Sequence, residues 1–99
     1  MKISLEGRNF DLTEAISSRV EKAIDKALKR YEDDIVMITV IMDFMKHRKG
    51  GQPSAHVKMH AEIPGPDLVA ENGHDDLYEA VDGALDRMVD QLQKRREML

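Results

Sequence analysis

Strict alternation of apolar and polar residues over residues 54–63 is the feature that most limits what this 99-residue chain can fold into. One set comprises Ala55, Val57, Met59, Ala61 and Ile63, and the other comprises Ser54, His56, Lys58, His60 and Glu62. Because successive side chains of a strand point to opposite faces, the segment predicts a strand with one buried and one solvated face. A second layer must therefore cover the buried face.

Three further segments have strand patterns. Residues 2–6 alternate and end at Gly7, and residues 67–71 follow a turn at Pro64-Gly65-Pro66. Residues 35–45 are rich in β-branched and apolar side chains. One face of that strand is expected to carry Val36, Ile38, Val40, Met42 and Phe44. Residues 46–53 predict a polar hairpin loop before the alternating strand.

Two segments have helical spacing. Residues 13–31 place apolar side chains on one face, with Thr13 as the expected N-cap. A second helix begins after Asp75 or Asp76, either of which could cap it, and continues to near the C-terminus. The order β-α-β-β-β-α then predicts an α+β two-layer sandwich. We expect a four-stranded mixed sheet with both helices packed on one face, similar to a double-stranded-RNA-binding domain.

Composition excludes several classes of protein. A chain of 11.3 kDa forms a single domain, so we expect one unit over residues 1–99. The absence of cysteine excludes disulfides, a thiol nucleophile and Cys-ligated zinc. The longest apolar stretch, residues 35–42, is far shorter than the roughly 20 residues of a membrane span. The N-terminus also lacks a secretory signal pattern, so a cytoplasmic protein without membrane contact is expected.

Catalytic and metal-binding patterns are equally scarce. His56 and His60 share a strand face, but four strand residues separate them by about 13 Å, too far for one metal. Loop residues His47 and His74 have no partner at ligand spacing, and no glycine-rich phosphate loop is present. Asp82, Asp86 and Asp90 read as a solvated helix ridge. We therefore expect no enzyme, no cofactor and no metal site.

Basic residues are the more informative set, although the net charge is −4 and any basic surface must be local. Cations of the first helix fall within about 100° of arc opposite the apolar stripe. They are Arg19, Lys22, Lys26, Lys29 and Arg30. On the second helix Arg87 and Lys94 are expected to share a face with Gly83, which Arg95 and Arg96 extend. If the helices lie side by side, these residues form one cationic strip suited to RNA phosphates. Exposed lysines are, however, also ordinary on any solvated helix face.

Other features refine this hypothesis. Loop residues 47–51 (HRKGG) either extend the basic patch or form a solvated turn. With two Tyr and two Phe, the chain has too few aromatic residues for a base-stacking platform, so structured RNA is the expected target.

Two blocks of sequence carry a family resemblance. Residues 3–15 (ISLEGRNFDLTEA) contain a strand, a Gly-x-Asn turn and a Thr-x-Ala helix start. Residues 76–83 (DLYEAVDG) correspond to an Asp-Met-Tyr-x-Ala-Ile-Asp segment, and Lys94-Arg95-Arg96 continues in register. In these blocks the chain resembles the short ribosome hibernation-promoting factors, the family that includes ribosome-associated inhibitor protein Y.

That resemblance implies a noncatalytic inhibitor that binds the small ribosomal subunit and its rRNA where tRNA and mRNA sit, in stationary phase or stress. It implies RNA contacts by Lys22, Lys26, Lys29, Arg30, Arg87, Lys94, Arg95 and Arg96, together with Arg8. One extra residue near the end of the first helix leaves Lys29 and Arg30 ambiguous by a position, and Asp90 stands where a basic residue is common. We expect a monomer off the ribosome without the C-terminal ribosome-dimerisation domain of longer members. Ribosome pairing would then need a separate factor, which in related systems is ribosome modulation factor.

A second class of function remains open from the residues alone. The solvated sheet face is partly apolar, with Met37, Thr39 and Ile41 beside the polar side chains of residues 54–62. Such a face is also typical of a protein-interaction module that pairs through its sheet.

Overall fold

A computed structural model describes residues 1–45 and 54–98 of the chain. Its elements are β1 (Lys2–Arg8), α1 (Glu14–Leu28), the 3₁₀ helix η1 (Lys29–Asp34), β2 (Met37–Met45), β3 (Ser54–Glu62), β4 (Leu68–His74) and α2 (Leu77–Glu97). The predicted order of strands and helices is confirmed. The loop expected over residues 46–53, including the basic residues 47–51, lies outside the described residues.

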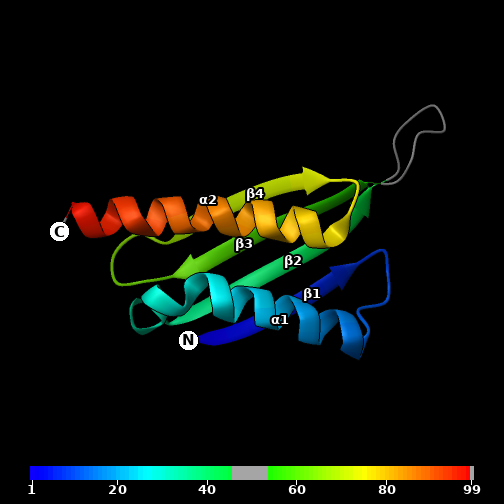
Figure 1. The fold of residues 1–99 in the computed structure, drawn as a ribbon, viewed down its shortest axis with the longest axis horizontal. Coiled ribbons are helices and arrows are strands. Elements are labelled where there is room, and N and C mark those ends of the chain that lie inside the picture. Colours follow the sequence, from blue (N-terminus) through cyan, green and yellow to red (C-terminus); the bar gives the residue numbers. More distant parts are fainter. Residues whose placement is uncertain (46–53, 99) are drawn as a thin grey trace.

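The four strands form one mixed sheet in the order β1-β2-β3-β4. β1 runs parallel to β2, and the other two pairs are antiparallel. Both helices cover the same face: α2 runs along β3 and β4, and α1 lies in front of β1 and β2 (Figure 1). The expected two-layer α+β sandwich is therefore confirmed, and the second face of the sheet is open among the described residues.

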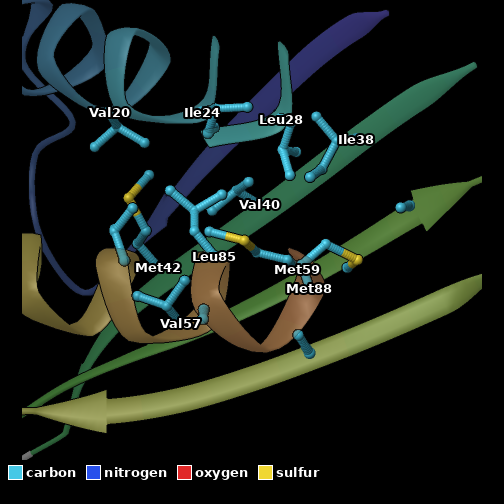
Figure 2. Close-up of a cluster of buried hydrophobic side chains, with 14 of the residues drawn as sticks. Val20, Ile24, Leu28, Ile38, Val40, Met42, Val57, Met59, Leu85 and Met88 are labelled. Carbon is cyan, nitrogen blue, oxygen red and sulfur yellow. The ribbon is translucent and has the colours of Figure 1, made fainter. Parts of the chain in front are cut away.

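The core lies between the helices and the covered face of the sheet. Side chains of α1 (Val20, Ile24), of the central strands and of α2 (Leu85, Met88) meet there (Figure 2). In β3 the inward set is buried as expected, with Val57 and Met59 fully inaccessible. Burying each side chain of this size contributes roughly 1.5–3 kcal/mol, so this layer holds α1 and α2 in fixed positions.

Polar side chains cap both helices. Thr13 Oγ1 accepts a hydrogen bond from the Ile16 amide at 3.2 Å, as predicted. Asp76 Oδ1 accepts from the amides of Tyr78 and Glu79 at 2.8 and 3.1 Å. Asp76 and not its neighbour is therefore the cap of α2, which settles the alternative that the sequence left open.

Several boundaries differ from the sequence expectation, and sheet pairing explains two of them. β1 continues through Gly7 to Arg8, and β4 continues through Gly73 to His74, because both ends pair with neighbouring strands. Ladder hydrogen bonds there outweigh the local turn preference of glycine.

The end of the first helix also differs. α1 stops at Leu28, and η1 continues to Asp34 while burying Tyr31. Val36, which was expected to face inward, is 62% exposed, and Ile35 is buried instead. Both residues precede the first residue of β2, so the two-residue alternation of the strand does not apply to them.

Candidate nucleic-acid interface

The outer surface of α1 carries exposed lysines. Val20, Ile24 and Leu28 turn one side of this helix toward the sheet, so Lys22 and Lys26 project into solvent. Lys29, at the start of η1, is also exposed, as is Lys94 on α2. Within residues 1–45 and 54–98, no side-chain hydrogen bond or ion pair engages these four ammonium groups. They are therefore available to phosphates of a partner.

Two arginines of α2 bond backbone carbonyls of β4 and of the turn that precedes it. Arg87 Nη1 donates to the Glu71 carbonyl at 2.8 Å, and Arg95 donates to the carbonyls of Pro66 and Pro64 at 3.2 and 2.5 Å. Gln91, midway between them, donates to the Val69 carbonyl at 2.7 Å. This four-residue spacing forms one ridge that satisfies backbone acceptors at the sheet edge.

That edge placement corrects the expected single cationic strip. Gly83, expected on an outward face with Arg87 and Lys94, packs against Asn72, and a Cβ at this position would overlap the Asn72 side chain. Helical spacing alone showed that Gly83 and Arg87 share a side of α2 but not that this side meets β4. Arg87 and Arg95 are thus bonded to the fold and not free between the helices.

Two of the remaining predicted cations, Arg96 and Arg8, are also placed by contacts within the fold. Arg96 bonds Asp34 and the carbonyl of Arg30, both in η1. Arg30 itself is exposed. Arg8 pairs with Glu6 at 3.0 Å and lies opposite Asp43 on β2, so it belongs to the open sheet face, away from the helices. The structure brings Lys22, Lys26, Lys29 and Arg30 together on one side and separates Arg8 from them.

A groove between the helices has mixed charge. Its lining comprises Ala23, Lys26, Ala27, Asp82, Leu85 and Asp86. Asp82, Asp86 and Asp90 are exposed, as expected for a solvated ridge. In this groove the one cation comes from α1 and the two carboxylates come from α2, and exposed Glu21 and Asp25 of α1 lie next to Lys22 and Lys26 in the sequence. Phosphates should favour the α1 side of this surface.

One contact between the two helices was not predicted from the sequence. The guanidinium of Arg19 sits 3.7 Å from the centroid of the Tyr78 ring, a cation–π contact that joins α1 to the first turn of α2. The sequence gives little indication of this contact, because helical spacing relates only residues of one helix and these two are 59 positions apart. Arg19 is therefore bound within the fold, unlike Lys22 and Lys26.

The open sheet face is polar at its centre. Thr39, Ile41, Lys58, His60 and Glu62 line a shallow depression there. His60 Nε2 lies 2.7 Å from Asp67, and Lys58 Nζ lies 4.0 Å from Glu71. Such exposed pairs stabilise little and leave a mixed rather than an apolar surface.

Clusters of metal ligands and membrane-spanning helices are absent from the described part of the chain. No three His, Asp or Glu side chains there are grouped so that they could hold a metal ion. Across the same residues, neither helix has the length and apolar character that a membrane span requires.

Comparisons with known proteins agree with one another. The model of a family described as sigma 54 modulation protein / S30EA ribosomal protein matches residues 3–99. A ribosome hibernation promoting factor of Azotobacter vinelandii is 32% identical over 97 residues, which cover 98% of this chain and 84% of that protein. The chain is therefore similar to this family and to this relative over nearly its whole length.

Solved structures give the same result. The N-terminal domain of protein Y from Thermus thermophilus has a TM-score of 0.79 and 32% identity, covering 95% of this chain and 98% of that one. A ribosomal subunit interface protein from Coxiella burnetii has a TM-score of 0.80 and 26% identity, covering 98% and 99% of the two chains. The resemblance read from the two sequence blocks is confirmed.

Proposed function

Because the chain belongs to the sigma 54 modulation protein / S30EA ribosomal protein family, we propose that it is a ribosome hibernation factor. It binds the small ribosomal subunit in the cytoplasm and occupies the sites of tRNA and mRNA, so that translation stops in stationary phase or stress. Residues 1–99 act as one ribosome-binding domain. Ribosome modulation factor is the proposed partner in any pairing of inactive ribosomes.

The prediction that the chain is not an enzyme is confirmed by its family. The matched family is described as a sigma 54 modulation protein / S30EA ribosomal protein family, and its relatives are named ribosome hibernation promoting factor and ribosomal subunit interface protein. Inhibition by such a protein needs occupancy of a site and no chemical step.

The observation that carries the choice of surface is the group of exposed lysines on the α1 side. Lys22, Lys26 and Lys29 project away from the sheet, and the described residues supply them with no ion-pair partner. Lysines that neutralise phosphates release condensed counterions, which favours binding at low salt. The RNA-facing surface is therefore centred on α1 and the start of η1, with Lys94 contributing from α2.

The aromatic residues support recognition of structured RNA through its backbone. Phe10 packs edge-on against Phe44 at 5.1 Å, Tyr31 is buried, and Tyr78 lies under Arg19. All four aromatic side chains of the chain thus have partners within the fold. Contact by shape and phosphate, rather than by stacking of splayed bases, fits this inventory.

Co-sedimentation with purified ribosomal subunits tests the proposal. We expect near one-to-one binding to small subunits, which weakens between about 50 and 300 mM salt with a log–log slope of about −3 for three to four phosphate contacts. Small subunits already loaded with mRNA and tRNA should bind less of the protein. Absence of binding at low salt, or equal binding to loaded subunits, would contradict the proposed site.

A pairing module based on the open sheet face is the alternative class. The centre of this face holds charged and imidazole side chains beside Thr39 and Ile41. Met45 and Val69 are also exposed on this face, but its centre, where a second sheet would pack, is polar and charged.

A further inference from the structure

Arg96, near the end of α2, contacts the 3₁₀ helix η1 at several points. Its Nη2 donates to the backbone carbonyl of Arg30 at 2.8 Å and to Asp34 Oδ2 at 3.0 Å, and its Nε donates to the same carboxylate at 3.3 Å. Its guanidinium carbon also lies 4.6 Å from the centroid of the Tyr31 ring. One side chain therefore contacts the second, third and last residues of η1.

The contacted segment is short and needs external support. η1 has six residues, and 3₁₀ geometry gives poorer hydrogen bonds than an α-helix, so runs of this length are uncommon on their own. Tyr31 is 4% exposed and fixes the inner side of the segment. The outer side carries Lys29 and Arg30, both exposed and both in the proposed RNA-facing surface. In Figure 1 this segment and the C-terminal end of α2 lie at the same end of the molecule.

We propose that Arg96 is a positioning residue: it holds η1 so that Lys29 and Arg30 are presented to RNA, and it does not itself contact RNA. The inference rests on the proposed function and deepens it, because it divides the Lys94-Arg95-Arg96 run by role. Arg96 is charge-paired with Asp34 and bonded to a backbone carbonyl, so its Nε and Nη2 groups are directed at η1, whereas Nη1 has no hydrogen-bond partner among the described residues. Lys94, on the same helical turn, makes no side-chain hydrogen bond or ion pair with the described residues.

The chain provides a matched control in the adjacent arginine. Arg95 also donates two hydrogen bonds to backbone carbonyls, but these belong to Pro64 and Pro66, in a turn that carries none of the proposed RNA cations. Arg96→Gln and Arg95→Gln remove the same charge from neighbouring positions. Any difference between the two variants in RNA binding therefore comes from the segment that each arginine contacts, and not from the loss of charge.

A double-mutant cycle tests the proposal, with purified small ribosomal subunits as the probe. The cycle combines Arg96→Gln with the double substitution Lys29→Gln/Arg30→Gln. The double substitution keeps the backbone carbonyl of residue 30, so the hydrogen bonds of Arg96 to η1 are retained. We expect Arg96→Gln to weaken binding about fivefold in the wild-type background and less than about twofold when Lys29 and Arg30 are already replaced. Arg95→Gln should have about the same effect in both backgrounds.

The results of this cycle distinguish failure of the inference about Arg96 from failure of the proposed function. If Arg96→Gln weakens binding equally in both backgrounds and lowers the salt slope by about one, Arg96 contacts a phosphate directly and the inference is overturned. If the wild-type chain does not bind small subunits, the proposed function falls first and this inference falls with it.

Hydrogen exchange and a second substitution test the contacts between Arg96 and η1 without relying on Arg96→Gln alone. Arg96→Gln should accelerate amide exchange over residues 29–34, and Arg95→Gln should not. Asp34→Ala removes the partner carboxylate, whereas Asp33→Ala removes an exposed neighbouring carboxylate. Loss of negative charge alone should tighten RNA binding in both variants. Asp34→Ala should instead bind less tightly than Asp33→Ala, and equal gains in the two would overturn the inference.

Discussion

Nη2 of Arg95 donates a hydrogen bond to the carbonyl oxygen of Pro64 at 2.5 Å, joining residues that are 31 positions apart in the sequence. The same guanidinium bonds Pro66, so it bridges the turn that links β3 to β4. Gly65, between the two prolines, has φ +96° and lies directly beneath the guanidinium. The C-terminal half of α2 is thereby fixed to one end of the sheet.

Replacing Gly65 tests this contact. In Gly65→Ala the new Cβ would overlap the Arg95 guanidinium, and alanine disfavours a positive φ. We expect the free energy of unfolding to fall by about 2 kcal/mol in urea titrations. Gly73→Ala is the control, because its Cβ would meet only the Ala55 carbonyl at an ordinary 3.7 Å. Equal effects of the two substitutions would contradict a requirement for glycine at position 65 of this turn.

The N-cap of α2 gives a second prediction. Asp76→Ala removes the acceptor for the Tyr78 and Glu79 amides, so thermal or urea unfolding should show a loss of about 1 kcal/mol. Asp75→Ala, one residue earlier and exposed, should change stability by less than about 0.5 kcal/mol. A larger effect at Asp75 than at Asp76 would contradict the cap assignment.

The edge position of Arg87 predicts a structural role that a surface lysine lacks. Arg87→Gln loses the hydrogen bond to the Glu71 carbonyl at the β4 edge, and we expect a destabilisation of about 1 kcal/mol. Lys94→Gln, on the same helix but exposed, should leave the unfolding midpoint nearly unchanged. The comparison fails if Lys94→Gln destabilises the protein as much as Arg87→Gln does.

The anionic wall of the interhelical groove should weaken RNA binding. Asp86 lines the same groove as Lys26, so Asp86→Asn should tighten binding to small subunits about twofold at low salt. Glu62→Gln changes the net charge equally, from an exposed position on the open sheet face. A filter-binding or anisotropy titration should therefore rank Asp86→Asn above Glu62→Gln. An equal gain would mean that net charge alone sets the affinity.

Periodicity predicted the fold well because each layer has one apolar face. The alternation of residues 54–63, the apolar face of residues 35–45 and the apolar stripes of the two helices together identified most of the buried core positions. Errors fell where tertiary contacts override local preference. Gly7 and Gly73 lie inside strands because partner strands extend past them, and Val36 lies outside the register of β2.

The candidate site was only partly predictable, because helical spacing gives the angle of a side chain but not its neighbour. Lys22, Lys26 and Lys29 were correctly expected to be exposed. Arg87 satisfied the same spacing argument yet bonds the edge of β4. A charge pattern does not show which long side chains reach backbone acceptors more than ten residues away in the sequence, and that distinction decides which cations remain free.

Binding of a charge-reversed α1 surface tests the central claim most directly. Lys22→Glu/Lys26→Glu should reduce affinity for purified small subunits by more than about tenfold at about 100 mM salt, because two phosphate contacts become repulsive. Lys2→Glu/Lys58→Glu makes the same change in net charge on the exposed strand positions of the open sheet face, and we expect a loss of less than about threefold. Equal losses in the two folded variants, or undiminished binding of the α1 variant, would contradict recognition of the ribosome through this helix.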